Sequence, residues 1–140
     1  MQILNVSGNQ LHFLPAELTK CPLIEIHAEI NNLSEFPKEL KGIKSLRLLN
    51  ISSNKISHIG KSIGTLRSLE YLSMEQNALA AIPADIGKLV MLKSLKVNGN
   101  KLEQVCFAGH AARACWEGSD ASVCPRTPAD TDRDWPLHVP

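Results

Sequence analysis

Residues 69–79 read LEYLSMEQNAL, and the spacing of their apolar side chains and asparagine decides the fold. Leu72 and Met74 alternate with polar residues, which predicts a short strand with one buried face. Asn77 follows where the chain is predicted to turn away. Because its amide can both donate and accept hydrogen bonds, we expect it to satisfy backbone groups of neighbouring coils. One such coil cannot bury its own apolar face, so the stretch predicts a stack.

The same spacing occurs five times, aligned on asparagines that lie 22 or 23 residues apart. These are Asn9, Asn31, Asn54, Asn77 and Asn100. Counted from eight residues before each asparagine, positions one, four, six and eleven are apolar in every unit, and the units cover 1–22, 23–45, 46–68, 69–91 and 92–105. Positions 14, 18 and 21 are also apolar, and proline is frequent at position 15. This second half predicts a short helical turn on the convex side.

The L-x-x-L-x-L-x-x-N-x-L pattern resembles that of leucine-rich repeats. The 23-residue length and the segments FPKELKGIKSL and IPADIGKLVML are similar to the intracellular repeats of the Ras-binding scaffolds, the Scribble and Erbin group, and their plant relatives. The resemblance covers residues 1–105. It implies an α/β leucine-rich-repeat solenoid, a right-handed β-α superhelix with a short curved parallel sheet and a helical or irregular convex side. It also implies a non-catalytic interaction module that binds a small GTPase or another signalling protein.

The pattern stops after Val105, and the composition changes there. No lysine occurs beyond Lys101, whereas the remaining residues hold both tryptophans, Trp116 and Trp135, and four of the eight prolines. We predict that residues 106–140 are a mostly disordered tail. The abrupt change, and the lack of a polar cap before Met1, leave open the alternative of a truncated isoform or fragment with no independent function.

The concave strand face is the predicted binding surface, because side chains at positions three, five and seven point there. The candidate residues are Glu25, His27, Glu29, Leu48, Asn50, Tyr71, Ser73, Glu75 and Lys96. Tyr71, the only tyrosine, is expected beside Leu48 across the stack, an arrangement typical of an interface anchor. A lateral packing row that only stiffens the sheet is the alternative. Glu25, Glu29, Glu70 and Glu75 would present negative charge to a basic partner.

Composition argues against several other classes. A net charge of +1 gives no reason to expect nucleic-acid binding, and no apolar run approaches the roughly twenty residues of a membrane span. No catalytic or cofactor-binding motif is recognisable, so we expect no enzyme activity and no cofactor. The first residues lack the features of a secretory signal, which favours a cytoplasmic location. N-x-S sequons at Asn5, Asn32 and Asn50 keep an extracellular recognition module as a further alternative.

The sequence contains two weak candidates for other sites, one for a metal ion and one for disulfide bonds. His27 between Glu25 and Glu29 lacks the further ligands that a metal site needs, and a solvated acidic patch is favoured. The tail cysteines Cys106, Cys115 and Cys124 form neither a C-x-C nor a C-x-x-C motif. We therefore expect free thiols there rather than a disulfide cap or a zinc site.

Overall fold

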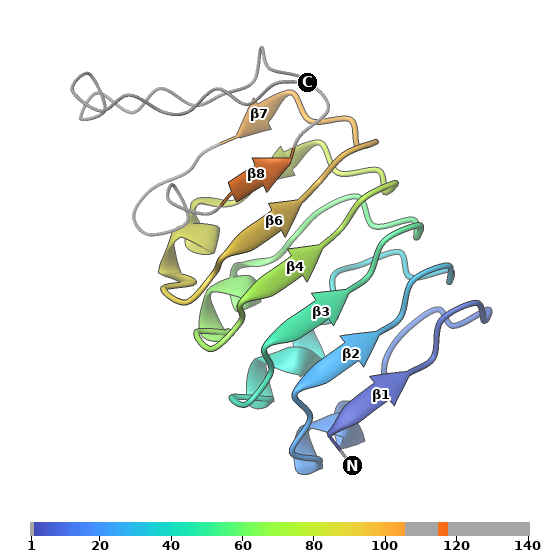
Figure 1. The fold of residues 1–140 in the computed structure, drawn as a ribbon. Helices are drawn as coiled ribbons and strands as arrows, with labels where there is room; N and C mark the ends of the chain where they lie inside the picture. Colours follow the sequence, from blue (N-terminus) through green and yellow to red (C-terminus); the bar gives the residue numbers. More distant parts are fainter. Residues whose placement is uncertain (1, 106–114, 118–140) are drawn as a thin grey trace.

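The computed structural model describes residues 2–105 and 115–117, and within these ranges the chain winds into stacked coils (Figure 1). One parallel sheet has the strand order β1-β2-β3-β4-β6-β8. Its strands are β1 (Ile3–Asn5), β2 (Glu25–His27), β3 (Leu48–Asn50), β4 (Tyr71–Ser73), β6 (Ser94–Lys96) and β8 (Cys115–Glu117). Each of the first five strands comes from the strand segment of one predicted unit. The predicted solenoid with a curved parallel sheet is confirmed.

The pairing register follows the asparagine alignment. Position-four residues pair from coil to coil, as Leu49 does with Leu72 and Leu72 with Leu95. Positions four and six of the second to fifth coils are at most 1% exposed, and Ile51 and Met74 are examples at position six. Alternation along each strand therefore sends one row of side chains into a continuous aliphatic core and leaves the other row outside.

The convex side carries 3₁₀ turns rather than α-helices. They are η1 (Ala16–Lys20), η2 (Lys38–Gly42), η3 (Lys61–Thr65) and η4 (Ala84–Lys88). Pro15, Pro37 and Pro83 directly precede three of them, as the sequence predicts. Positions 18 and 21 are three residues apart, which matches the three residues per turn of a 3₁₀ helix. Both therefore face the core, as Leu40 and Ile43 show with at most 2% exposure.

The asparagines form the predicted backbone clamp between coils. In the fourth coil, Asn77 Oδ1 accepts from the backbone N–H of Ile56 at 3.0 Å. Its Nδ2 donates to the carbonyl oxygen of Ile51 at 3.0 Å and to that of Met74 at 3.2 Å. Asn31, Asn54 and Asn100 repeat this arrangement. Each asparagine thus pairs backbone groups of its own coil and of the preceding one.

Position eight has a left-handed backbone in all five coils. The residues are Gly8 (φ 69°), Ile30 (φ 55°), Ser53 (φ 53°), Gln76 (φ 53°) and Gly99 (φ 69°). A positive φ is unusual for a β-branched residue such as Ile30. The apolar pattern carries no sign of this turn, because only two of the five residues are glycine.

Two pairings were not expected from the sequence. β5 (Ala81–Ile82) and β7 (Gln104–Val105) form a separate two-stranded parallel sheet. β8 pairs with β6 and aligns Trp116 with Leu95, inside the segment that the sequence assigned to the tail. β8 begins 21 residues after the first residue of β6 and lacks the leucine and asparagine spacing, so the pattern did not reveal it. The predicted disorder of the rest of 106–140, and the side chains of its cysteines, lie outside the described residues.

Candidate protein-binding face

The strands of the large sheet bring seven of the nine predicted concave residues together in two rows, and Glu29 and Glu75 follow the ends of β2 and β4. Row three runs Ile3, Glu25, Leu48, Tyr71 and Ser94, and row five runs Asn5, His27, Asn50, Ser73 and Lys96. In Figure 1 these strands lie side by side on one side of the coils. Each residue of the two rows therefore lies opposite the neighbour that the repeat alignment predicts.

Tyr71 and Leu48 are paired directly across β3 and β4. Tyr71 is 47% exposed, and Leu48 beside it is partly exposed. An aromatic ring that is only half buried against an aliphatic neighbour retains apolar area for a partner. The fully buried Leu49 and Leu72 beneath them hold the strand backbone in place. The pair therefore exposes apolar area above a buried layer of the core.

A hydrogen-bond network fixes Glu75 at the end of β4. Ser73 Oγ donates to Glu75 Oε2 at 3.3 Å, and Asn98 Nδ2 donates to Glu75 Oε1 at 3.1 Å. Ser52 Oγ lies 2.8 Å from Ser73 Oγ and accepts from the backbone N–H of Glu75 at 3.2 Å. Both carboxylate oxygens of Glu75 are therefore already occupied by donors of this chain. The sequence counted Glu75 among charges open to a partner, and it could not reveal these contacts.

Glu29 has a different environment, although it occupies the same repeat position as Glu75. Its Oε2 is buried and has no hydrogen-bond partner within the described part of the chain. Nearby on β2, Glu25 Oε2 lies 3.4 Å from His27 Nε2, a long contact between partly exposed groups. A buried carboxylate oxygen without a donor is costly, so Glu29 is the acidic group of this face that its own chain satisfies least.

Glu70 is neutralised within the chain. Its Oε2 lies 2.5 Å from Lys93 Nζ, and its Oε1 lies 3.7 Å from Arg47 Nε. The hydrogen bond from Lys93 and the nearby positive charges lower the pKa of Glu70 against a smaller opposing effect of desolvation. The same hydrogen bond raises the pKa of Lys93. Arg47, Glu70 and Lys93 occupy position two of successive coils and form a position-two ladder, so Glu70 does not present a free charge.

Other kinds of site find little support in the part of the chain that the structure describes. No group of three or more His, Cys, Asp or Glu side chains there is arranged to hold a metal ion. No helix in that part is long and apolar enough to cross a membrane. Cys21 is a partly buried free cysteine packed against the core.

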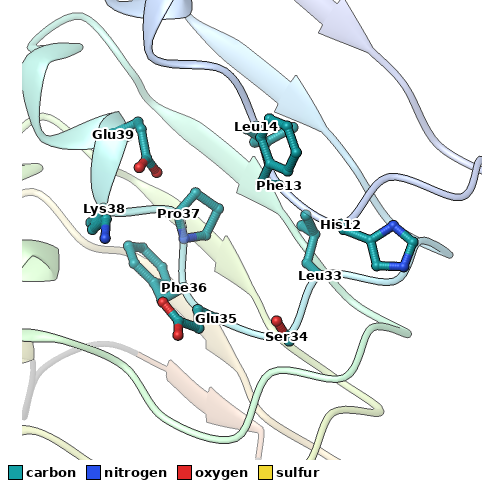
Figure 2. A pocket seen from close by; sticks show the side chains of 10 residues that line it. All are labelled: His12, Phe13, Leu14, Leu33, Ser34, Glu35, Phe36, Pro37, Lys38 and Glu39. Carbon is teal, nitrogen blue, oxygen red and sulfur yellow. The ribbon is translucent and has the colours of Figure 1, made fainter.

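A shallow hollow of about 250 Å³ lies between the outer loops of the first two coils (Figure 2). Its lining includes Phe13, Leu14, Leu33, Phe36 and Pro37. Phe13 is 73% exposed at its rim. The repeat pattern gives no sign of this hollow, although Phe13 replaces a residue that is polar or small in the later coils. It is smaller than typical small-molecule sites of about 300–1,000 Å³, so the concave face is the better candidate.

Comparisons with known proteins support the repeat assignment. The family model described as "Leucine rich repeat" matches residues 25–79 and 44–102, which together span more than half of the 140 residues. No curated protein sequence matches the chain significantly.

Solved structures agree on the fold. A leucine-rich-repeat protein of Leptospira interrogans has a TM-score of 0.68 at 35% identity, over 71% of this chain and 26% of its own. The functional domain of InlJ from Listeria monocytogenes, which includes a cysteine ladder, has a TM-score of 0.70 at 21% identity, over 84% of this chain and 25% of its own. A TDR receptor has a TM-score of 0.74 at 24% identity, over 84% of this chain and 22% of its own. The chain therefore spans about a quarter of the length of these structures.

Proposed function

Because this chain belongs to the leucine-rich-repeat family, we propose that it is a non-catalytic module that binds a protein partner on its concave strand face. Leucine-rich repeats typically mediate protein–protein interaction. The observation that carries the proposal is the half-exposed Tyr71 beside Leu48, above the buried side chains of Leu49 and Leu72. Aromatic side chains in such settings are enriched among the residues that dominate binding energy.

The distribution of charge on this face points to a partner with a basic side chain near β2. Glu70 is paired with Lys93, and the carboxylate oxygens of Glu75 already accept hydrogen bonds from the neutral side chains of Ser73 and Asn98. Glu25 on β2 pairs with Leu48, and Glu29 follows the end of β2, so these two carboxylates add negative charge on the β2 side of Leu48 and Tyr71. A guanidinium or ammonium group placed there would form charge-assisted hydrogen bonds, which are the stronger kind.

A signalling role in the cytoplasm is the finer part of this proposal. It rests on the similarity of the 23-residue units to the Ras-binding scaffold repeats, and a small GTPase or another signalling protein is the corresponding partner. Fractionation of cells that express the tagged chain tests the location. Recovery in the secretory pathway with glycans at Asn5 or Asn50 would favour the extracellular alternative instead.

Affinity capture with matched variants tests the binding face. Proteins retained by the unaltered chain should be lost with Tyr71→Ala, since the variant removes the anchor ring. Phe13→Ser is the control, because it removes an even more exposed aromatic from the outer loop of another coil. Glu25→Lys should weaken the binding of a basic partner about tenfold or more. Proteins that are retained equally by all variants would show that the concave face is not the binding surface.

A further inference from the structure

The convex side of the second and third coils carries a cluster of positive charge. Residues 38–44 and 61–67 together contain five basic side chains and one acidic side chain, that of Glu39. The five basic residues, called here the basic convex patch, are all exposed: Lys38, Lys41, Lys44, Lys61 and Arg67. The net charge of +1 therefore conceals a local excess of positive charge on one side of the molecule.

The 3₁₀ turns direct these side chains away from the core. Leu40 in η2 and Ile63 in η3 are buried. Lys38 and Lys41 lie three residues apart in η2, and side chains at that spacing are eclipsed in a 3₁₀ helix, so both project outward on the same side. η2 packs against η3, and Figure 1 shows the turns stacked on one side of the coils. The cations of the two coils therefore share one outward surface.

The charges of the basic convex patch are largely left without a counterion from the same chain. No salt bridge among the described residues involves a member of the patch. Asp85, in the neighbouring η4, is paired with Lys88. A hydrogen bond from Lys88 is the main cause that lowers the pKa of Asp85, and the charge of Lys61 contributes less. The patch is therefore available to an external anionic surface.

Two exposed apolar side chains border the patch on the fourth coil. Val90 and Met91 are 50% and 51% exposed. Val90 occupies position 22, the position of Lys44 and Arg67 in the second and third coils, and this position is exposed in each of the first four coils. Its exposure is thus a property of the repeat position. Basic side chains beside apolar ones are the combination that holds a protein surface on an anionic lipid interface.

The composition of the patch favours lipid over other anionic partners. Residues 38–44, 61–67 and 84–91 contain no aromatic side chain on which a nucleic-acid base could stack. Four of the five cations are lysines, a residue type that is depleted in protein–protein interfaces. Lysine presents a hydrated point charge on a flexible stem. Mobile lipid headgroups can adapt to such charges without a fixed geometry.

We propose that the basic convex patch binds an anionic membrane surface, with Val90 and Met91 inserted among the headgroups at its border. The cytoplasmic leaflet, with its anionic lipids, has the required chemistry. The concave strand face lies on the other side of the coils and remains open to a protein partner in this orientation. Membrane binding uses no residue of the concave face, so it does not depend on the proposed protein-binding function.

Sedimentation of the 140-residue chain with lipid vesicles tests the charges. We expect binding to phosphatidylcholine mixed with phosphatidylserine, none to phosphatidylcholine alone, and weaker binding as the salt concentration rises. Lys41→Ala/Lys44→Ala should weaken binding about twentyfold, since each cation near an anionic surface contributes about fivefold. Lys55→Ala/Lys101→Ala is the matched control, because it removes the same charge from exposed lysines at position ten of two coils. It should bind nearly as well as the unaltered chain.

The apolar border is tested with Val90→Ser/Met91→Ser, which should weaken vesicle binding while circular dichroism shows an unchanged fold. Tyr71→Ala should leave vesicle binding unchanged, which separates this proposal from binding on the concave face. A fluorescent acidic peptide and a DNA duplex serve as soluble anionic competitors. Binding to phosphatidylcholine alone, equal losses in the two lysine variants, unaltered binding by Val90→Ser/Met91→Ser, or tighter binding to either competitor than to vesicles would each overturn the proposal.

Discussion

The fourth coil and the first coil follow the same sequence pattern, yet their residues have different surroundings. Leu72 is 1% exposed and Asn77 is 9% exposed, whereas Leu4 is only partly buried and Asn9 is exposed. Asn77 binds backbone groups of two coils, and Asn9 Nδ2 donates only to carbonyls of its own coil, those of Val6 and Ser7. The comparison shows that the stabilisation provided by a repeat residue depends on how many coils pack around it, and not on its amino-acid type alone.

Truncation of the position-four leucines should give the largest contrast between the two coils. Leu72→Ala should cost about 4 kcal/mol of unfolding free energy, because it leaves a cavity in a closed core. Leu4→Ala should cost about 1–2 kcal/mol, since part of its side chain is already in water. Urea unfolding followed by circular dichroism measures both. Equal losses would mean that the first coil is as well packed as the fourth.

Replacement of the asparagines should give the next largest contrast. Asn77→Ala leaves the buried N–H of Ile56 without its acceptor, whereas the carbonyl of Ile51 still accepts from Asn54, so the change should cost about 2 kcal/mol. Asn9→Ala should cost less than about 1 kcal/mol, because water reaches the same groups in the first coil. The same unfolding assay applies. If the two variants lose equal stability, the clamp between coils is not what makes the asparagine necessary.

Alanine substitutions at position eight should separate two costs in unfolding free energy: the strain of a left-handed backbone and the steric contact of the added Cβ. Gly8 and Gly99 share φ 69°, but a Cβ at Gly8 meets nothing within 4 Å and one at Gly99 would lie 2.5 Å from Gln76 Nε2. Gly8→Ala should therefore cost about 1 kcal/mol from the left-handed conformation alone. Gly99→Ala should cost roughly 1 kcal/mol more, and a further Gln76→Ala change should remove the difference. A persistent difference in the double variant would assign the excess to something other than Gln76.

The sequence predicted what repeats and missed what is particular to one coil. The facing of Leu48 and Tyr71, the clamp by Asn77 and the turn after Pro37 all follow from a register that five units enforce together. The pairing of Glu70 with Arg47 and Lys93 depends on side-chain conformations at one place in the stack, and the apolar pattern carries no information about it. The sequence did not predict β8, because Trp116 pairs with Leu95 but lacks the flanking leucine and asparagine of the repeat.

The position-two ladder gives the smallest expected effect, and it distinguishes the central coils from the first. Arg47, Glu70 and Lys93 occupy this position in the third to fifth coils, whereas Gln2 and Ile24 occupy it in the first two. Because the pKa of Glu70 is lowered from 4.5 in the folded protein, its stabilising contribution is present above pH 4.5 and is lost as the pH falls through the folded value.

Glu70→Gln should therefore flatten the acid limb of a plot of unfolding free energy against pH, measured by urea unfolding between pH 2 and 7. The difference from the unaltered chain should be small and should shrink further in 1 M salt, because exposed ion pairs are screened. Gln2→Glu is the matched control: it adds a carboxylate at the same position of the first coil, where Ile24 offers no cation. An acid limb that Glu70→Gln leaves unchanged would show that the ladder contributes nothing measurable, so that the central coils differ from the first through packing and the asparagine clamp alone.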